Sequence, residues 1–320
     1  MDPSAKKRFQ RLLLRWFDTN KRDLPWRKDT DPYRVWLSEI MLQQTRVNAV
    51  LDHYQRFLGR FPTVSHLARA REASILAAWS GLGYYRRARM LHAAAREIVG
   101  NHTGKFPHSA AELKNLPGIG RYTAAAIASI AFGEAMAVVD GNVERVLQRL
   151  HGKPIRGEAL WQAAQELINA ERPGDHNQAL MELGATVCSP KAPRCRACPI
   201  LQLCATQGEG ARIQTKTPQK KRTVAYVLDR RDGSVLLTKR GPAETLMPGM
   251  WELPQGGKPN GVQPLFTVRH SITVTDYRVR VLPGPTSIKA PNSRWLRHGQ
   301  LAKLPLTGLT RKILRAAKVI

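Results

Sequence analysis

Four cysteines close together in the sequence are the strongest constraint on how this 320-residue chain folds. They are the only cysteines in the chain and follow the pattern Cys-x6-Cys-x2-Cys-x5-Cys: Cys188, Cys195, Cys198 and Cys204. Thiols at this density indicate a metal site, and the spacing favours an iron–sulfur cluster over zinc, whose ligands usually come as two CxxC or CxxH pairs. Local disulfides are a further alternative. We do not favour them, because the opening Met-Asp-Pro-Ser-Ala-Lys-Lys-Arg contains no apolar segment that would direct the chain to an oxidising compartment.

The charge balance indicates a polyanionic partner. Lys and Arg number 51 against 24 Asp and Glu, which gives a formal net charge of +27 at pH 7. Such an excess favours nucleic acid, because binding to phosphates releases their counterions. A generally basic proteome or a membrane surface would also account for the charge. No apolar run approaches the roughly 20 residues that a membrane span requires, so we expect no membrane partner.

A change in composition divides the chain into two parts. Residues 205–222 (ATQGEGARIQTKTPQKKR) lack apolar periodicity and read as a basic linker. Before them, apolar residues recur at helical spacing, which predicts an all-helical domain over residues 1–204. After them, segments such as TVAYVLDRRDGSVLLTKR alternate apolar and polar residues around Asp-Gly, and LTGLTRKILRAAK reads as a helix. Residues 223–320 are therefore expected to form a small α+β domain.

A glycine-rich turn between two helices is a candidate site for a phosphate. The segment LKNLPGIGRYTAAAIASIAF places Gly118 and Gly120 between two apolar helical runs. Backbone N–H groups without side chains over them suit an anion such as a DNA phosphate, although a plain tight turn between helices is the commoner explanation. An aspartate, Asp140, follows shortly afterwards in AVVDGNVERV.

Together, the hairpin LPGIGRYTAAAIAS, the aspartate of VVDGNVERV and the four-cysteine segment resemble the helix-hairpin-helix DNA glycosylases that contain a [4Fe–4S] cluster. Within them, WLSEIMLQQTRV and GLGYYRRAR are similar to the MutY adenine glycosylase family. The resemblance covers the whole helical part. It implies a helix-hairpin-helix domain with an iron–sulfur cluster loop, and an enzyme of base excision repair that removes adenine mispaired with 8-oxoguanine or guanine in double-stranded DNA. It also implies a monomer associated with DNA in a bacterial cytoplasm.

Two carboxylates with opposite tasks suit the chemistry of adenine release. The leaving purine needs a proton, and the sugar becomes oxocarbenium-like. Glu39, in the apolar helix VWLSEIML, should have a raised pKa and act as the general acid. Asp140, at a helix start, should be ionised and stabilise the oxocarbenium by charge or by a transient bond. Alternatively, Glu39 pairs with Arg34 or Arg46 on the helix face, and Asp140 is only a helix N-cap.

Two further residues bear on the reaction type. Tyr122 lies where the related endonuclease III-like enzymes have a lysine that attacks the sugar, and a phenol cannot form a Schiff base. We therefore expect a monofunctional glycosylase that leaves an intact abasic strand, whether Tyr122 hydrogen-bonds in the site or only fills its wall. The resemblance gives Asn142 the role of holding Asp140 or a water, the alternative being an ordinary residue of the first helical turn.

Adenine must leave the base stack before it is cut, and the resemblance indicates which residues fill the gap. Gln44 and Tyr84 match the intercalating positions, with Leu42 and Leu82 as apolar neighbours. Core packing under the Gly-Leu-Gly turn is the alternative for Tyr84 and for the tyrosine after it, Tyr85. Basic residues suited to phosphate contacts, or simply solvated, are Arg86, Arg87 and Arg89, and in the cysteine segment Lys191, Arg194 and Arg196.

The C-terminal part resembles a reduced Nudix domain. GMWELPQGGKPNG matches the strand and turn before a Nudix box, but the acidic metal-binding helix is missing, so we expect lesion recognition without pyrophosphate cleavage. The family often carries a Phe-Ser-His triplet for 8-oxoguanine. Here the sequence at residues 270–274 is His-Ser-Ile-Thr-Val, in which Thr273 supplies a hydroxyl but nothing replaces the histidine. Either other groups such as His270 or Ser271 read the lesion, or the preference for 8-oxoguanine is reduced.

Three alternative functions remain: a catalytically silent lesion-binding protein, a redox-responsive regulator that uses the cluster, and a glycosylase for another mispaired base such as thymine opposite guanine. The first two do not account for Glu39, Asp140 and Tyr122 at the positions that an adenine glycosylase requires. The third is disfavoured because Glu39 is the proton donor that adenine needs.

Overall fold

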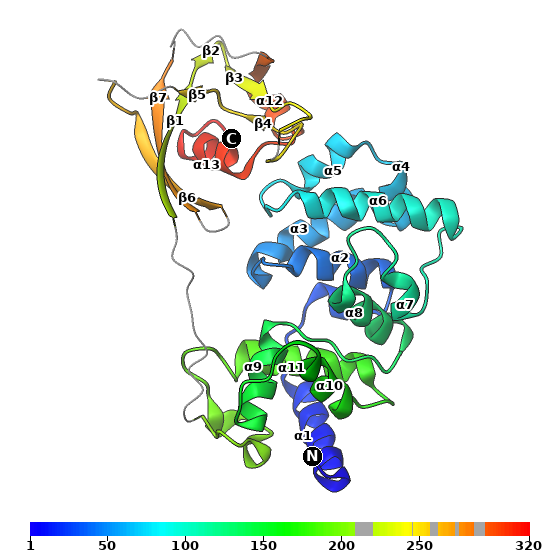
Figure 1. Ribbon diagram of the computed structural model, residues 1–320. Helices are drawn as coiled ribbons and strands as arrows, with labels where there is room; N and C mark the ends of the chain where they lie inside the picture. The colour runs from blue at the N-terminus through cyan, green and yellow to red at the C-terminus, as the bar shows by residue number, and fades with distance from the viewer. Residues whose placement is uncertain (209–219, 245, 257–261, 273–274, 285–291) are drawn as a thin grey trace. The chain divides into compact units, whose positions relative to one another are not determined.

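Helices follow one another through the first part of the chain, which confirms the all-helical prediction (Figure 1). The computed structural model describes residues 1–208, 220–244, 246–256, 262–272, 275–284 and 292–320. The α-helices of this part are α1 (Pro3–Asn20), α2 (Pro32–Leu42), α3 (Val47–Arg60), α4 (Val64–Arg69), α5 (Glu72–Trp79), α6 (Arg86–Asn101), α7 (Ala110–Leu113), α8 (Arg121–Phe132), α9 (Gly141–His151), α10 (Gly157–Leu167) and α11 (Pro173–Thr186). Short 3-10 helices are η1 (Pro25–Arg27), η2 (Cys195–Ala197) and η3 (Leu201–Leu203).

Several helices begin where the sequence supplies a cap. The Asp2 carboxylate accepts hydrogen bonds from two backbone N–H groups at the start of α1, and Asp31 does the same for one at the start of α2. Each of these helices has proline in its first turn, as does α11, because proline has no N–H to leave unsatisfied there. These local signals fix where α2 starts and hence where its buried carboxyl lies.

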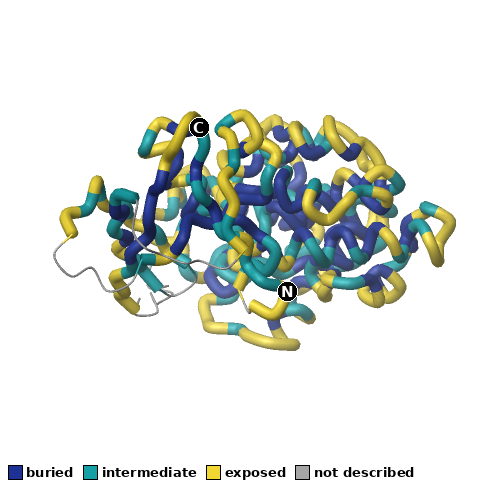
Figure 2. Tube along the Cα trace, turned by 90° about the horizontal axis from the view of Figure 1, so that it is seen from above, coloured by how far each residue is buried: buried dark blue, intermediate teal, exposed yellow. Residues whose placement is uncertain are grey.

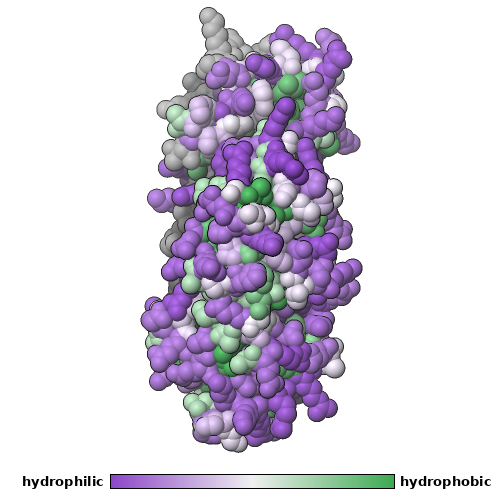
Figure 3. All heavy atoms as spheres, turned by 90° about the vertical axis from the view of Figure 1, so that its right-hand side faces the viewer, coloured by the Kyte–Doolittle hydropathy of each residue, from purple (hydrophilic) through white to green (hydrophobic). Residues whose placement is uncertain are grey.

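Packing divides the chain into two units, which are Met1–Gln55 with Thr63–Ser65 and Ala93–Thr215, and Arg56–Pro62 with His66–His92 and Lys216–Ile320. In both, buried residues run through the interior of the Cα trace and exposed residues lie on its outside (Figure 2). Hydrophilic side chains cover most of the face drawn in Figure 3, as the composition leads one to expect. Among the described residues, no helix combines the length and apolar character needed to cross a bilayer.

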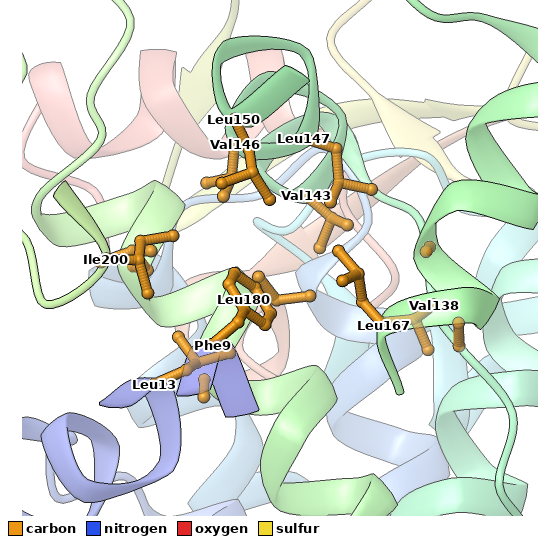
Figure 4. Close-up of a cluster of buried hydrophobic side chains, with 14 of the residues drawn as sticks. Phe9, Leu13, Val138, Val143, Val146, Leu147, Leu150, Leu167, Leu180 and Ile200 are labelled. Carbon is orange, nitrogen blue, oxygen red and sulfur yellow. The ribbon is translucent and has the colours of Figure 1, made fainter. Parts of the chain in front are cut away.

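The core of the first unit is built by α1, α9 and α11. Figure 4 shows Phe9 and Leu13 of α1 extending toward Leu180 of α11, with Ile200 and the apolar residues of α9 around them. Phe9 and Leu13 are completely buried. Burying a side chain of this size contributes about 1.5–3 kcal/mol. This core fixes α9 and α11, and both helices supply side chains to the cavity described below.

The second unit contains the mixed α+β structure that the sequence predicts. The elements of this α+β structure are β1 (Lys220–Leu228), β2 (Arg230–Arg231), β3 (Ser234–Lys239), β4 (Trp251–Glu252), β5 (Gln255–Gly256), β6 (Phe266–Ile272), β7 (Thr275–Pro283), β8 (Ser293–Arg297), α12 (His298–Leu301) and α13 (Gly308–Ala316). One sheet has the order β5-β1-β7-β6, with β1 and β7 parallel. The other has the order β2-β3-β4, with β8 paired to β3. Ile313 and Leu314 of α13 pack into the core of this unit.

Candidate active site

A cavity of about 520 Å³ in the first unit brings together the carboxylates that the sequence singles out. Its walls come from the segment around η1, from α2 and the residues after it, from α8, from the start of α9 and from α11. Among the lining residues are Arg22, Arg27, Ser38, Glu39, Leu42, Gln43, Gln44, Tyr122, Asp140, Asn142, Gln178, Met181 and Glu182.

Glu39 is the buried acid of this cavity. It lies in α2, where Val35–Met41 are all buried, and it is only 6% exposed. The Tyr122 hydroxyl donates to Glu39 Oε2 at 2.7 Å and also approaches Met181 Sδ at 3.2 Å. Burial, with a smaller contribution from the charge of Asp140, raises the pKa of Glu39 to about 7, against the opposing effects of the Tyr122 hydrogen bond and the charge of Arg27. Near neutral pH this carboxyl therefore still holds a proton that it can donate.

Of the two arginines considered as helix-face partners of Glu39, Arg34 pairs with Asp29 instead. Tyr122 is fixed by the first turn of α8, and burial followed by the charges of Glu39 and Asp140 raises its pKa well above 10. The phenol therefore stays protonated and donates its hydrogen bond to Glu39.

Asp140 is the N-cap of α9 and also faces the cavity. Its Oδ1 accepts from the backbone N–H groups of Asn142 at 2.9 Å and Val143 at 2.7 Å, and its Oδ2 accepts from Asn142 Nδ2 at 2.8 Å. Arg145 Nη2 in turn donates to Asn142 Oδ1 at 2.7 Å. Three N–H groups and the positive end of the helix therefore direct partial positive charge at the Asp140 carboxylate. The capping role and a charge-stabilising role are therefore compatible in one residue.

A third carboxylate, Glu182, lies in the cavity wall and was missed by the sequence analysis. Its side chain is completely buried and accepts from Arg22 Nε at 2.6 Å, Arg22 Nη2 at 2.9 Å and Arg27 Nη2 at 2.9 Å. Burial alone would raise its pKa, but the bonds and charges of the two arginines outweigh burial and lower it. The only sequence signal was a lone Glu in the apolar run ALMELGA of α11, the same signal that identified Glu39.

The predicted phosphate-binding hairpin lies between α7 and α8. Gly118 has φ +74°, a left-handed conformation that favours glycine, and Gly120 is the N-cap of α8. Both glycines are exposed, so their backbone groups are accessible to an anion.

The predicted intercalating residues differ in their surroundings. Gln44 is exposed just beyond α2 with φ +55°, and Leu42 beside it lines the cavity. In the second unit, Tyr84 is 43% exposed with φ +48°, and Arg86 is also exposed. Leu82 is buried at 6% exposure, so the structure places it under the turn. Thr273 lies outside the described residues.

The four cysteines are all half-buried and unpaired. Burial, with smaller contributions from the other three thiols, raises the pKa of Cys198 to about 11, although a hydrogen bond from the Ile200 backbone opposes the change. Arg149 Nη1 donates to Cys188 Sγ at 3.2 Å. Within the described ranges, no group of three or more His, Cys, Asp or Glu side chains is placed as it would be around a metal ion. The donor set itself, four thiols beside a cationic donor, fits a cluster or a zinc ion.

Comparison with known proteins identifies relatives of the chain. Residues 37–169 match the family described as HhH-GPD superfamily base excision DNA repair protein. The chain is 49% identical over 211 residues to the adenine DNA glycosylase of Rattus norvegicus and 48% identical over 211 residues to that of Homo sapiens. These matches cover 61% of this chain and 41% and 39% of the two proteins, so the chain spans about two fifths of their length. The structure of a thermostable thymine-DNA glycosylase is similar with a TM-score of 0.60 and 31% identity, over 63% of this chain and 96% of the other.

Proposed function

The chain belongs to the helix-hairpin-helix superfamily of base excision DNA repair proteins, and on that premise we propose that it is a glycosylase removing adenine paired with 8-oxoguanine or guanine in double-stranded DNA. The observation that carries this proposal is Glu39, a buried carboxyl with a pKa of about 7 in a cavity that also contains Asp140. The alternative functions without catalysis give no reason for a protonated acid at this place.

Glu39 supplies the proton in the proposed reaction. When the bond between the sugar C1′ and adenine N9 breaks, its electron pair passes to the base, and Glu39 donates its proton to N7 so that the base leaves neutral. Tyr122 holds the carboxyl in place by its 2.7 Å hydrogen bond. The cavity volume of about 520 Å³ accommodates a purine that has been turned out of the stack.

Asp140 stabilises the sugar as it becomes oxocarbenium-like. Its carboxylate accepts hydrogen bonds from three N–H groups, two of Asn142 and one of Val143, so it has the fixed position that such a role needs. A water then adds its oxygen to C1′ and gives its proton to the Glu39 carboxylate, which restores the acid and leaves an intact abasic strand. Among the described residues that line the cavity, none is a lysine, which supports a reaction without a Schiff base.

The four cysteines would hold a [4Fe–4S] cluster, whose contribution when bound is structural. Arg149 is 5% exposed and donates to Cys188 Sγ, to the Ser189 carbonyl at 2.9 Å and to the Pro190 carbonyl at 3.2 Å. This arginine therefore fixes the start of the cysteine segment against α9. The exposed basic residues of the segment, which would face DNA phosphates, are Lys191, Arg194 and Arg196.

The C-terminal α+β part would read the base opposite adenine. The motif GMWELPQGG and the mixed sheet with parallel β1 and β7 support a reduced Nudix-like domain. His270 lies on β6 opposite Tyr277 of β7, and Ser271 lies opposite Asp276, next to the connection between the strands. These groups are the described candidates for contact with the opposite strand, in addition to Thr273.

Single-turnover assays on a duplex with adenine opposite 8-oxoguanine test the proposal. The expected products are free adenine and a strand that breaks only after heat or alkali, with no adduct trapped by borohydride. An efficient borohydride adduct would show that an amine reaches the sugar and would overturn the reaction type. A duplex from which no adenine is released would overturn the function.

A further inference from the structure

The turn that carries Tyr84 has a backbone that needs support. It comprises residues 81–84, between α5 and α6, and Gly81, Gly83 and Tyr84 have φ values of +112°, +72° and +48°. For tyrosine, the left-handed region is unfavourable and persists only where the surroundings hold it. The Tyr84 ring is nevertheless 43% exposed, so its own packing supplies little of that support.

Two buried side chains hold the ends of this turn, and both bind the same atom. Ser80 Oγ, immediately before the turn, donates to the Leu306 carbonyl oxygen at 2.7 Å. Tyr85 Oη, immediately after it, donates to the same oxygen at 3.2 Å. Ser80 and Tyr85 are 5% and 3% exposed, so water does not compete well for these bonds. A single carbonyl group from the C-terminal α+β part therefore fixes both ends of the turn.

The C-terminal part also fixes Ser80 and Leu306 themselves. Arg311 Nε of α13 donates to Ser80 Oγ at 3.1 Å, which leaves the Ser80 hydroxyl proton to be donated to Leu306. Leu306 is completely buried, and the residues on either side of it bind Trp251 of β4: Trp251 N donates to the Pro305 carbonyl at 2.8 Å and Thr307 N to the Trp251 carbonyl at 3.0 Å. The position of the carbonyl is thus set by the sheet.

The ring of Tyr84 is linked to the same support through Arg87. The Arg87 guanidinium lies 5.4 Å from the centre of the Tyr84 ring and 5.6 Å from that of the buried Trp79. Such stacking fixes the direction of an exposed ring. A shift of the turn would break this contact as well as the hydrogen bonds at its ends.

We propose that Ser80, Tyr85 and Arg311, together with the Leu306 carbonyl, form a latch through which the C-terminal α+β part sets the conformation of the Tyr84 turn. The three side chains are positioning residues that act through Tyr84 and do not touch the reacting atoms. This inference rests on the proposed function and on the prediction from the family resemblance that Tyr84 enters the duplex beside the mispair. It means that the C-terminal part influences the opposite strand even where its own atoms do not reach the base.

The test uses full-length protein carrying Glu39→Gln, so that the bound duplex is not cut, and a duplex with 2-aminopurine beside the 8-oxoguanine. Binding should unstack the probe and raise its fluorescence, and Tyr84→Ala should abolish most of the rise. Arg311→Met should reduce the rise at saturating protein by roughly two- to tenfold, the effect expected for the loss of one or two buried hydrogen bonds. The matched control is Arg315→Met, which removes the same charge from an exposed position one turn along α13.

Epistasis with Tyr84 separates the latch from a general loss of stability. In the Tyr84→Ala background, Arg311→Met should cause no further loss of fluorescence. Ser80→Ala and Tyr85→Phe are smaller changes that should act in the same direction as Arg311→Met, and thermal unfolding identifies any variant that is not folded. The latch is overturned if Arg311→Met, Ser80→Ala and Tyr85→Phe are all folded and all show the same fluorescence rise as the parent. It is also overturned if Arg311→Met lowers the signal equally in the Tyr84→Ala background. A Tyr84→Ala variant that leaves the signal unchanged overturns it as well.

The latch and the proposed function fail in different ways. If protein with normal Glu39 releases no adenine, the proposed function is wrong. The latch still stands in that case if the fluorescence rise depends on Arg311 through Tyr84. If adenine release is normal but the latch variants leave the fluorescence unchanged, the proposed function stands and the latch is wrong.

Discussion

At the scale of single residues, the account depends on one carboxyl that is kept protonated by its surroundings. Burial is the largest influence on Glu39, and the Asp140 charge acts in the same direction. The Tyr122 hydrogen bond favours the ionised form and keeps the pKa near 7. The result is an acid that is both protonated and able to release its proton at neutral pH.

Replacing Glu39 by glutamine should separate binding from chemistry. The amide keeps the shape of the side chain but has no acidic proton, so single-turnover adenine release should fall at least about 10²- to 10⁴-fold while duplex affinity is retained. Glu166→Gln, at an exposed position on α10, is the matched control and should react like the parent. Near-normal release by Glu39→Gln would leave Glu39 as a structural residue of α2.

The dependence on pH gives a second test, with a defined direction. Because the acid must be protonated, the rate of release should fall as pH rises through about 7. Tyr122→Phe removes a hydrogen bond that lowers the Glu39 pKa, so in this variant the fall should move to higher pH. A pH–rate profile measured on both proteins decides the point. A shift to lower pH would mean that the hydrogen bond does not act as described.

Local context in the sequence indicates Glu39, a charge in an apolar helix, and Asp140, an acid at a helix start. Tyr122 is indicated only by the family resemblance, which has a lysine at its position in the endonuclease III-like enzymes. The ion pair of Arg22 with Glu182 joins residues 160 positions apart, and nothing local indicates it. The roles of the individual site residues stay predictions until the variants are measured.

At the scale of secondary-structure elements, the start of α9 has two functions. Asp140 caps the helix through two backbone N–H groups, and the same carboxylate is the proposed anion of the active site. Serine can cap a helix as aspartate does, but it carries no negative charge.

Asp140→Ser should therefore separate the two functions. The serine hydroxyl can still cap α9, so the free energy of unfolding should change by no more than about 1 kcal/mol. Adenine release should nevertheless fall on the order of 10²-fold or more, because the charge beside the sugar is lost. Asp2→Ser makes the same exchange at the exposed start of α1 and should leave release unchanged. Unfolding curves and single-turnover rates together give the answer, and retained release in Asp140→Ser would reduce Asp140 to a cap.

The cysteine segment makes a prediction at the same scale. Cys198→Ala should lower the iron and acid-labile sulfide content of the purified protein and its thermal stability, because a bound cluster stabilises the folded state. Lys191→Ala in the same segment should keep both. Zinc without sulfide in the parent protein would contradict the cluster and leave a zinc site.

At the scale of the whole molecule, composition and alternating patterns correctly predict an α-helical part followed by an α+β part. The packing units add a finding that such patterns cannot supply, because α5 and the greater part of α4 belong to the same unit as the C-terminal residues. The hydrogen bond from Ser80 to Leu306 joins residues 226 positions apart, beyond the reach of any local signal. The predicted segments 1–204, 205–222 and 223–320 therefore describe composition, and their independence as domains stays a prediction.

The most direct test of the central claim is base release from a panel of duplexes that differ only in one pair: adenine opposite 8-oxoguanine, guanine or thymine, and thymine or uracil opposite guanine. With enzyme in excess, we predict rapid release of adenine opposite 8-oxoguanine and guanine and much slower release from every other duplex, because Glu39 is placed to protonate a purine. Release of thymine or uracil without adenine would contradict the account and would favour a function like that of the thymine-DNA glycosylase relative.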